Sequence, residues 1–168
     1  MGGLSFGSEV TMWMAMKTSL LAAAAIASPQ ASPSGYWQTA IRGRDAPDQY
    51  RNFWKAGSPD TDLDAWRRIS PELNTDRIKA PLLMQLPEQE IVSTLQFYAR
   101  MTNTPTPVEL YAYPQESHTK LQPRHRFAVY RRNLDWFRYW LQGYRDPDPA
   151  IAAQYSRWDD LSARRDPK

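Results

Sequence analysis

Three short stretches of mainly apolar residues have the length of β-strands and end at turn residues. They are Leu21–Ala27, Pro81–Leu86 and Val108–Tyr113, and the first closes at Ser28-Pro29. An apolar run of about four to eight residues with such an ending is typical of a strand that is buried in a parallel sheet. The pattern therefore predicts strands that helices cover.

Apolar residues at helical spacing fill much of the remaining chain. Helices are predicted over Glu9–Leu20 and Val92–Met101, and from Gln122 to about Gln142, where Gly143 supplies a stop. On the last helix, one stripe is expected to face the core, namely Tyr130, Leu134, Phe137 and Leu141.

The other segments carry weaker patterns. Residues 30–36 are rich in Ser, Pro and Gly and are expected to form a loop. Residues 46–54 and 63–68 are expected to form short helical pieces. Ala150–Arg164 is amphipathic and is expected to lie on the surface or to pack on a larger protein.

Composition narrows the class of protein. The length of 168 residues suits one domain, and a hydrophobic fraction of 42% is enough for a core. The net charge of +3 comes from 21 basic and 18 acidic residues with interspersed signs, which does not indicate nucleic-acid binding. The most basic run, residues 124–126 with 131–132, is expected to be a solvated helix face.

The chain has no cysteine, which excludes disulfides, thiolate zinc sites and a cysteine nucleophile. The sequence also shows no cluster of metal ligands, and we expect no metal and no cofactor. The absence of cysteine fits either the cytoplasm or the periplasm. We expect a soluble protein, in the cytoplasm rather than in the periplasm.

One segment has two interpretations. Residues 14–17, followed by Thr18–Ser28, resemble a signal peptide with a small-residue cleavage site. The apolar run is too short to span a membrane. It also lies directly after the serine motif described next, where a helix and a buried strand are expected. We therefore favour helix and strand, and a mature N-terminus near Ser28 would contradict this.

Residues 3–7, Gly-Leu-Ser-Phe-Gly, have the G-x-S-x-G pattern of a nucleophile elbow. In such an elbow a serine occupies a sharp, strained turn between a strand and a helix, and its closely packed flanks require residues without side chains. Gly3 and Gly7 supply those positions, and Ser5 Oγ would project from the tip of the turn. The pattern alone is weak, because small residues recur by chance in loops.

Two further segments strengthen this hypothesis. His118, one of two histidines, follows the strand predicted to end at Tyr113, and Glu88 and Glu90 follow the strand predicted to end at Leu86. The order is then nucleophile, acid and histidine, each just after a strand. This is the chain order of α/β-hydrolases.

The stretch from Gly2 to about Gly143 resembles the C-terminal half of the catalytic domain of prolyl oligopeptidase-type (S9) serine peptidases. Residues 3–7 are similar to the family's nucleophile motif, Gln85–Ile91 to its G-x-x-D-x-x-V motif and Tyr113–His118 to its Y-P-x-x-x-H motif. The resemblance implies an α/β-hydrolase fold with a parallel sheet flanked by helices. It assigns residues 1–143 to a partial catalytic domain and residues 144–168 to a tail with a short amphipathic helix.

The resemblance also has departures. Glu88 stands where the family usually has Asp, and Glu90 stands where prolyl oligopeptidases often place a substrate-binding Arg, which argues against proline-specific cleavage. The Glu at the acid position, the elbow Leu4–Glu9 and the tail Asp146–Pro149 are most similar to lasso-peptide isopeptidases. These members of the family hydrolyse the isopeptide bond of a threaded macrolactam peptide.

The resemblance implies hydrolysis of a peptide or isopeptide bond through a Ser-His-Glu triad and an acyl-enzyme. Ser5 is the expected nucleophile, and His118 is the expected general base. Glu88 is expected to orient the imidazole, although Glu90 and Glu116 lie nearby in the sequence.

Further residues are expected around this triad. The backbone N–H of Phe6 is the expected oxyanion donor. Tyr36, Trp37 and Ile91 are expected to line the substrate pocket, with core or loop packing as their alternative role. His125 is expected to lie on the surface.

The expected partner is a peptide substrate, with a threaded lasso peptide as one form, and neither nucleic acid nor a membrane is expected. The resemblance places the propeller, the strands before the elbow and the upstream oxyanion donor outside this sequence. The open alternatives are another S9-type exopeptidase or esterase, and an inactive fragment that needs the upstream half of the domain.

Overall fold

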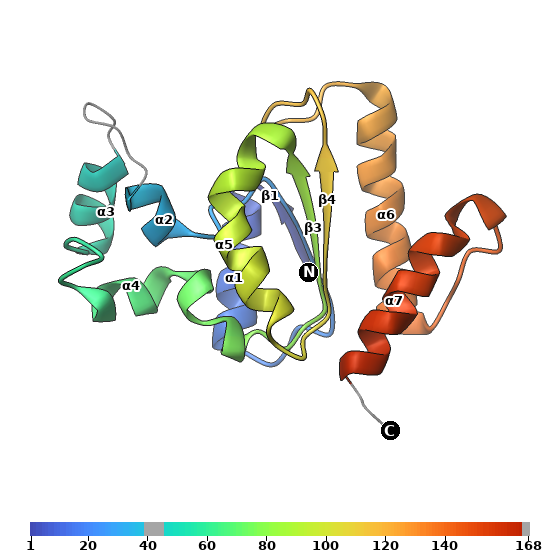
Figure 1. The fold of residues 1–168 in the computed structure, drawn as a ribbon, viewed down its shortest axis with the longest axis horizontal. Coiled ribbons are helices and arrows are strands. Elements are labelled where there is room, and N and C mark those ends of the chain that lie inside the picture. The colour runs from blue at the N-terminus through green and yellow to red at the C-terminus, as the bar shows by residue number, and fades with distance from the viewer. Residues whose placement is uncertain (39–45, 166–168) are drawn as a thin grey trace.

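The computed structural model describes residues 1–38 and 46–165. Within them, four parallel strands form one sheet in the order β1-β2-β3-β4 (Figure 1). The strands are β1 (Gly2–Leu4), β2 (Ala24–Ala27), β3 (Leu82–Pro87) and β4 (Val108–Tyr113). The prediction of an α/β fold with a parallel sheet flanked by helices is confirmed.

Helices connect the strands and cover both faces of the sheet. Helices α1 (Phe6–Lys17) and α5 (Ile91–Thr102) lie on one face, and α6 (Pro123–Gln142) and α7 (Ala152–Arg165) lie on the other (Figure 1). Three further helices follow β2 and precede β3 in the sequence, namely α2 (Pro33–Gln38), α3 (Ala46–Trp54) and α4 (Leu63–Ile69). Short 3₁₀ turns occur at Pro71–Leu73, Thr75–Arg77, Glu88–Glu90 and Pro149–Ile151.

The strand side chains alternate between two cores. Ile26 and Met84 belong to a buried cluster with Met12 of α1 and Phe97 of α5. Leu83, one position from Met84, packs instead with Trp136 of α6 and its neighbours. This alternation is the two-residue period of a strand, and it occurs here in strands that are apolar on both faces.

Residues 14–28, for which the sequence left two interpretations, contribute to helix α1 and strand β2. Met14 and Lys17 lie in α1, and Ala24–Ala27 forms β2, a fully buried strand between β1 and β3. The loop expected over residues 30–36 is shorter than predicted, because α2 begins at Pro33.

The core stripe predicted for α6 is wrong. Tyr130, Leu134 and Leu141 are at least half exposed, and among the stripe residues only Phe137 packs against a core cluster. The buried face carries Val129 and Trp136 instead. Polar residues accompany them on that face, since Gln85 Nε2 donates to Asn133 Oδ1 at 2.8 Å.

The last helix packs against α6 rather than lying free. Tyr155 and Trp158 of α7 are buried in the cluster that contains Trp136. Ring centroids of Trp136 and Trp158 are 5.1 Å apart in an edge-on arrangement. The division of the chain at residue 143 stays a prediction, since this packing alone does not decide where a domain ends.

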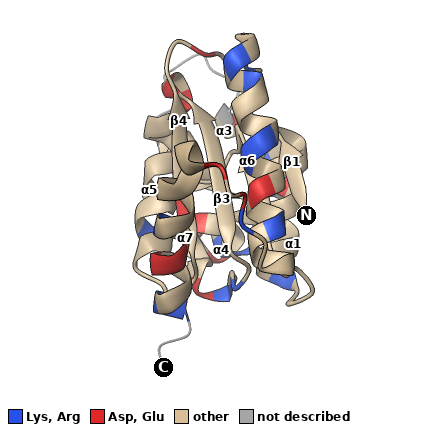
Figure 2. Ribbon diagram, turned by 90° about the vertical axis from the view of Figure 1, so that its right-hand side faces the viewer, with Lys and Arg blue, Asp and Glu red and all other residues tan. Residues whose placement is uncertain are grey.

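Basic residues recur along α6 up to Arg138, and none lies in its last turn (Figure 2). Arg124 and Arg126 are exposed, as expected of a solvated face. Arg131 and Arg132 are not: Arg131 pairs with Asp148 at 3.2 Å, and Arg132 donates to the Tyr113 hydroxyl at 2.6 Å. In the part of the chain that the structure describes, no helix is both long and apolar enough to cross a membrane.

Candidate active site

The carboxyl ends of all four strands meet at one edge of the sheet, because the strands are parallel. Ser5 follows β1, Ser28 follows β2, Glu88–Glu90 follows β3, and the loop with His118 follows β4. Ligands and reactive groups of open α/β sheets gather at this edge. The topology thus brings together residues that are far apart in the sequence.

Ser5 occupies a strained turn between β1 and α1. Its φ of 56° and ψ of −125° lie in a region that residues with side chains rarely adopt. Ser5 N donates to Ala27 O at 2.9 Å, which anchors the turn to the end of β2. A strained serine between a strand and a helix is the geometry of a nucleophile elbow.

The two glycines of the motif have different surroundings. A Cβ at Gly3 would overlap the Gly7 carbonyl group and approach Ser8 N to 2.6 Å, so the turn leaves no room for a side chain there. A Cβ at Gly7 would meet nothing within 4 Å in the described residues. The expectation of a crowded flank therefore holds at Gly3 and not at Gly7.

The Ser8 side chain fastens the elbow to the sheet. Its hydroxyl is fully buried and lies 2.7 Å from Gly3 O and 2.8 Å from Ala27 O. It also accepts from Ala27 N at 3.0 Å. The first turn of α1 is thereby held against the end of β2, close to Ser5.

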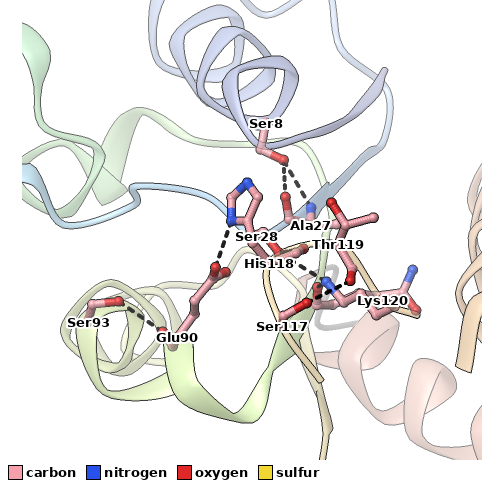
Figure 3. Close-up of polar contacts among 10 residues, drawn as sticks. Ser8, Ala27, Ser28, Glu90, Ser93, Ser117, His118, Thr119 and Lys120 are labelled. Atoms are coloured by element: carbon pink, nitrogen blue, oxygen red, sulfur yellow. Dashed lines mark hydrogen bonds and ion pairs between the residues drawn. The ribbon is translucent and has the colours of Figure 1, made fainter. Parts of the chain in front are cut away.

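His118 is paired with Glu90. The distance from His118 Nδ1 to Glu90 Oε1 is 2.7 Å, and Figure 3 shows the Glu90 side chain reaching the ring from the start of α5. An ionised carboxylate can only accept, so Nδ1 carries the proton in this pair. The second ring nitrogen, Nε2, is then left to accept a proton, as a general base requires.

Glu88 does not take the place expected for it. Its Oε2 accepts the backbone N–H of Gln115 at 3.0 Å, at the start of the loop that carries His118. The expectation that Glu88 orients His118 is therefore not met, and Glu90 makes that contact. Glu116, the other nearby carboxylate, is buried and accepts from the N–H groups of Leu121 and Gln122 and from His125 Nδ1.

Ser5, His118 and Glu90 line one pocket of about 290 Å³. Tyr36 also lines this pocket, and its role in substrate binding stays a prediction. Glu9, which the sequence did not single out, is a further lining residue, and burial raises the pKa of its carboxyl while His118 acts in the opposite direction. Its place four residues after Ser5, one helical turn along α1, was the available signal.

Trp37 and Ile91 are not among the residues that line this pocket. Trp37 packs edge-on against Trp66, with ring centroids 5.5 Å apart, in a cluster formed by α2, α3 and α4. Ile91, the first residue of α5, packs against the main core. Both residues have the packing contacts that the sequence left open as their alternative role, and a contact with substrate stays a prediction.

Phe6 begins α1, and its side chain is largely exposed. The first N–H groups of a helix have no acceptor within the helix, so the Phe6 N–H is available to an anion beside Ser5. His125 is not a surface residue, since it pairs with the buried Glu116 at 2.7 Å. The residues the structure describes contain no group of three or more acidic or histidine side chains that could hold a metal ion.

A model of the prolyl oligopeptidase family of peptidases matches residues 1–144. The chain belongs to this family. The matched residues include the strained Ser5 and the His118–Glu90 pair.

Within the family, the chain is similar to a lasso peptide isopeptidase, AtxE2 of Asticcacaulis excentricus. The two are 45% identical over 100 residues, which are 60% of this chain and 14% of AtxE2. The structure of apo AtxE2 has a TM-score of 0.85 at 34% identity, and the structure with Astexin3-dC4 bound has a TM-score of 0.84 at the same identity. Each match covers 98% of this chain and 25% of the AtxE2 chain.

A more distant match is the acylaminoacyl peptidase of Pyrococcus horikoshii, with a TM-score of 0.68 at 21% identity over 87% of this chain. At that identity the likeness shows the fold alone. The chain spans about a quarter of the length of these solved structures.

Proposed function

We propose that this chain carries the reactive site of a serine peptidase that hydrolyses peptide or isopeptide bonds. In this proposal Ser5 is the nucleophile, His118 is the general base and Glu90, rather than Glu88, holds the imidazole. One observation carries the proposal. The strained Ser5 lines the same pocket as His118 and Glu90, whose Nδ1 and Oε1 atoms are 2.7 Å apart. Membership in a peptidase family supports it.

The proposed reaction has two halves. Ser5 Oγ attacks the carbonyl carbon while His118 Nε2 takes the hydroxyl proton, and the Phe6 N–H stabilises the negative oxygen of the tetrahedral intermediate. The carbon–nitrogen bond then breaks, and His118 returns the proton to the leaving amine. Water attacks the acyl-enzyme with His118 again as base, which releases the carboxylic acid and restores Ser5.

Glu90 acts on the ring and not on the substrate. By accepting from Nδ1–H it fixes the tautomer in which Nε2 is the basic nitrogen, and it stabilises the imidazolium that forms when the proton arrives. Its Oε1 contact and its partial burial make it the carboxylate that can do both.

For the substrate, we propose a lasso-type peptide whose ring is closed by an isopeptide bond. AtxE2 is named a lasso peptide isopeptidase and is 45% identical to this chain over the aligned residues. An isopeptide bond is an amide, so the reaction above applies to it unchanged. A second pocket of about 250 Å³ with a mainly apolar lining meets the first at Glu9 and Gln30, which gives a bulky peptide further apolar surface.

The test uses a fluorophosphonate probe, which reacts with an activated serine. The probe is applied to the 168-residue chain and to a chimera in which this chain replaces the part of AtxE2 that it matches. Each protein is compared with its Ser5→Ala variant. We expect labelling of the chimera that disappears in Ser5→Ala, together with release of the linear peptide from a lasso substrate.

A Ser156→Ala variant is the matched control for loss of a serine hydroxyl, because Ser156 is an exposed residue of α7 and the variant keeps the elbow intact. Labelling without cleavage of a lasso peptide, but with cleavage of a simple ester or a peptide end, would reject the isopeptidase assignment and favour an ordinary esterase or exopeptidase. A well-folded chimera without labelling at Ser5 would reject the hydrolase itself.

A further inference from the structure

The loop that carries His118 also contains a lysine with a buried side chain. Lys120 follows His118 by two residues, and only 6% of its surface is exposed. Its ammonium donates to Ser28 Oγ at 3.0 Å and to the backbone oxygen of Gln85 at 3.0 Å. Lysine is seldom buried unless its charge is paired or hydrogen-bonded, and these two contacts meet that need.

The Ser28 hydroxyl continues this chain of contacts to the histidine. Ser28 follows the last residue of β2 and has a φ of 51°, in the left-handed region. Its hydroxyl donates to the backbone oxygen of His118 at 2.8 Å. One ammonium group thus connects the ends of β2 and β3 with the backbone of His118 itself, as Figure 3 shows for the Ser28, His118 and Lys120 contacts.

The charge of Lys120 also bears on the site. Burial lowers the pKa of the ammonium, while the carboxylates of Glu90 and Glu116 act in the opposite direction. Glu90 Oε2 is buried, and no described residue donates a hydrogen bond to it. The carboxylate that meets His118 therefore also acts electrostatically on the Lys120 ammonium.

We propose that Lys120, acting through Ser28, is a positioning residue that holds His118 in register with Glu90 and Ser5. This inference rests on the proposed function, because it concerns the base of that reaction. Without the ammonium, Ser28 Oγ keeps its bond to His118 O but loses its own donor, and the link from this group to Gln85 O of β3 is lost. The ring would then sample positions away from Glu90.

Three variants separate positioning from folding. Lys120→Met removes the donors and keeps much of the length of the side chain. Ser28→Ala is milder, because it breaks the link to His118 and leaves the Lys120 contact with Gln85 intact. Lys79→Met, at an exposed lysine, is the matched control.

Two readouts are measured on the folded 168-residue chain and on the AtxE2 chimera. The first is the tautomer of the His118 ring, from ¹⁵N NMR of histidine-labelled protein, with a His118→Ala sample to assign the signals. The second is the rate of fluorophosphonate labelling per folded molecule. A loosened base should slow labelling on the order of 10- to 100-fold, the scale for a displacement of about 1 Å in an active site.

We expect Lys120→Met and Ser28→Ala to change the Nδ1–H tautomer into a mixture and to slow labelling, while Lys79→Met changes neither. If folded Ser28→Ala and Lys120→Met keep both the tautomer and the rate, Lys120 is merely structural and the inference is wrong. If the unaltered proteins show no labelling but the variants still lose the tautomer, Lys120 positions the ring and the proposed peptidase reaction fails instead.

Discussion

His118 takes its carboxylate from Glu90, although Glu88 is only two residues away. Nδ1 of His118 is 2.7 Å from Glu90 Oε1, whereas Glu88 Oε2 accepts from Gln115 N at 3.0 Å. Both glutamates belong to the 3₁₀ turn Glu88–Glu90. Three residues complete a 3₁₀ turn, so side chains two positions apart point in different directions. One carboxylate therefore reaches the ring, and the other holds the start of the loop that carries it.

This relationship predicts opposite outcomes for two equivalent substitutions. Glu90→Gln should slow hydrolysis on the order of 10³- to 10⁴-fold, because an amide in place of the triad acid favours the wrong tautomer of the histidine. Glu88→Gln should change the rate little, since its contact is with the backbone of Gln115. The measurement is the rate of lasso-peptide cleavage by the AtxE2 chimera that carries each variant.

The two variants serve as controls for each other, because each removes one negative charge from the same turn. A large loss in Glu88→Gln with none in Glu90→Gln would return the role of the acid to Glu88. Thermal unfolding of both variants would show whether a loss of rate reflects a loss of fold.

The sequence does not determine which of these two glutamates contacts His118. The motif alignment places the acid at Glu88, and a second glutamate, Glu90, follows the same strand. Which one faces the histidine depends on the backbone of the turn, which the strand and helix patterns on either side do not determine. The parallel sheet itself was predictable, because its buried strands are apolar on both faces, and Val108–Tyr113 has the predicted bounds.

The buried face of α6 was missed for a different reason. Its apolar residues at helical spacing are largely exposed, and the face that packs on the sheet includes Arg132 and Asn133. Their partners are Tyr113 of β4 and Gln85 of β3, which satisfy the polar groups under the helix. A polar residue with a distant partner cannot be told from a solvated one in the sequence, so the stripe was assigned to the wrong side.

The elbow predicts a difference between its two glycines. Gly3→Ala should destabilise the chain by about 3 kcal/mol or more, at or above the usual range for overpacking, because the new Cβ would overlap backbone atoms of Gly7. Gly7→Ala should be tolerated, since that Cβ meets open space in the described residues and alanine favours the first turn of a helix. Urea unfolding of the two variants measures both free energies. Equal losses would mean that Gly7 is confined by contacts outside the described residues.

Helix α7 is predicted to be part of the stable unit. Trp158 is fully buried against Trp136, and its indole nitrogen donates to Glu109 of β4. Trp158→Ala should therefore cost about 3–5 kcal/mol of unfolding free energy. The control is Phe127→Ala, at an exposed aromatic residue of α6, which should stay within about 0.5 kcal/mol. A small cost at Trp158 would favour residues 144–168 as a separable tail.

The Glu116 carboxylate predicts a dependence of stability on pH. Burial alone would raise its pKa, but hydrogen bonds from Leu121 N, His125 and Gln122 N outweigh this and lower the pKa in the folded chain. A carboxyl with a lowered folded pKa stabilises the fold fully above its unfolded pKa, and that contribution is lost as the pH falls through the folded pKa. Acidification should therefore remove it.

Glu116→Gln should lower the melting temperature at neutral pH, because the amide cannot accept from all three donors. The difference from the unaltered chain should then shrink as the pH falls below the ordinary carboxyl range, where Glu116 becomes protonated in the folded chain as well. Melting curves of both proteins across a pH series measure this window. A difference that stays constant into strong acid would mean that Glu116 stabilises the loop by packing alone, and that its charge does not hold the His125 pair in place.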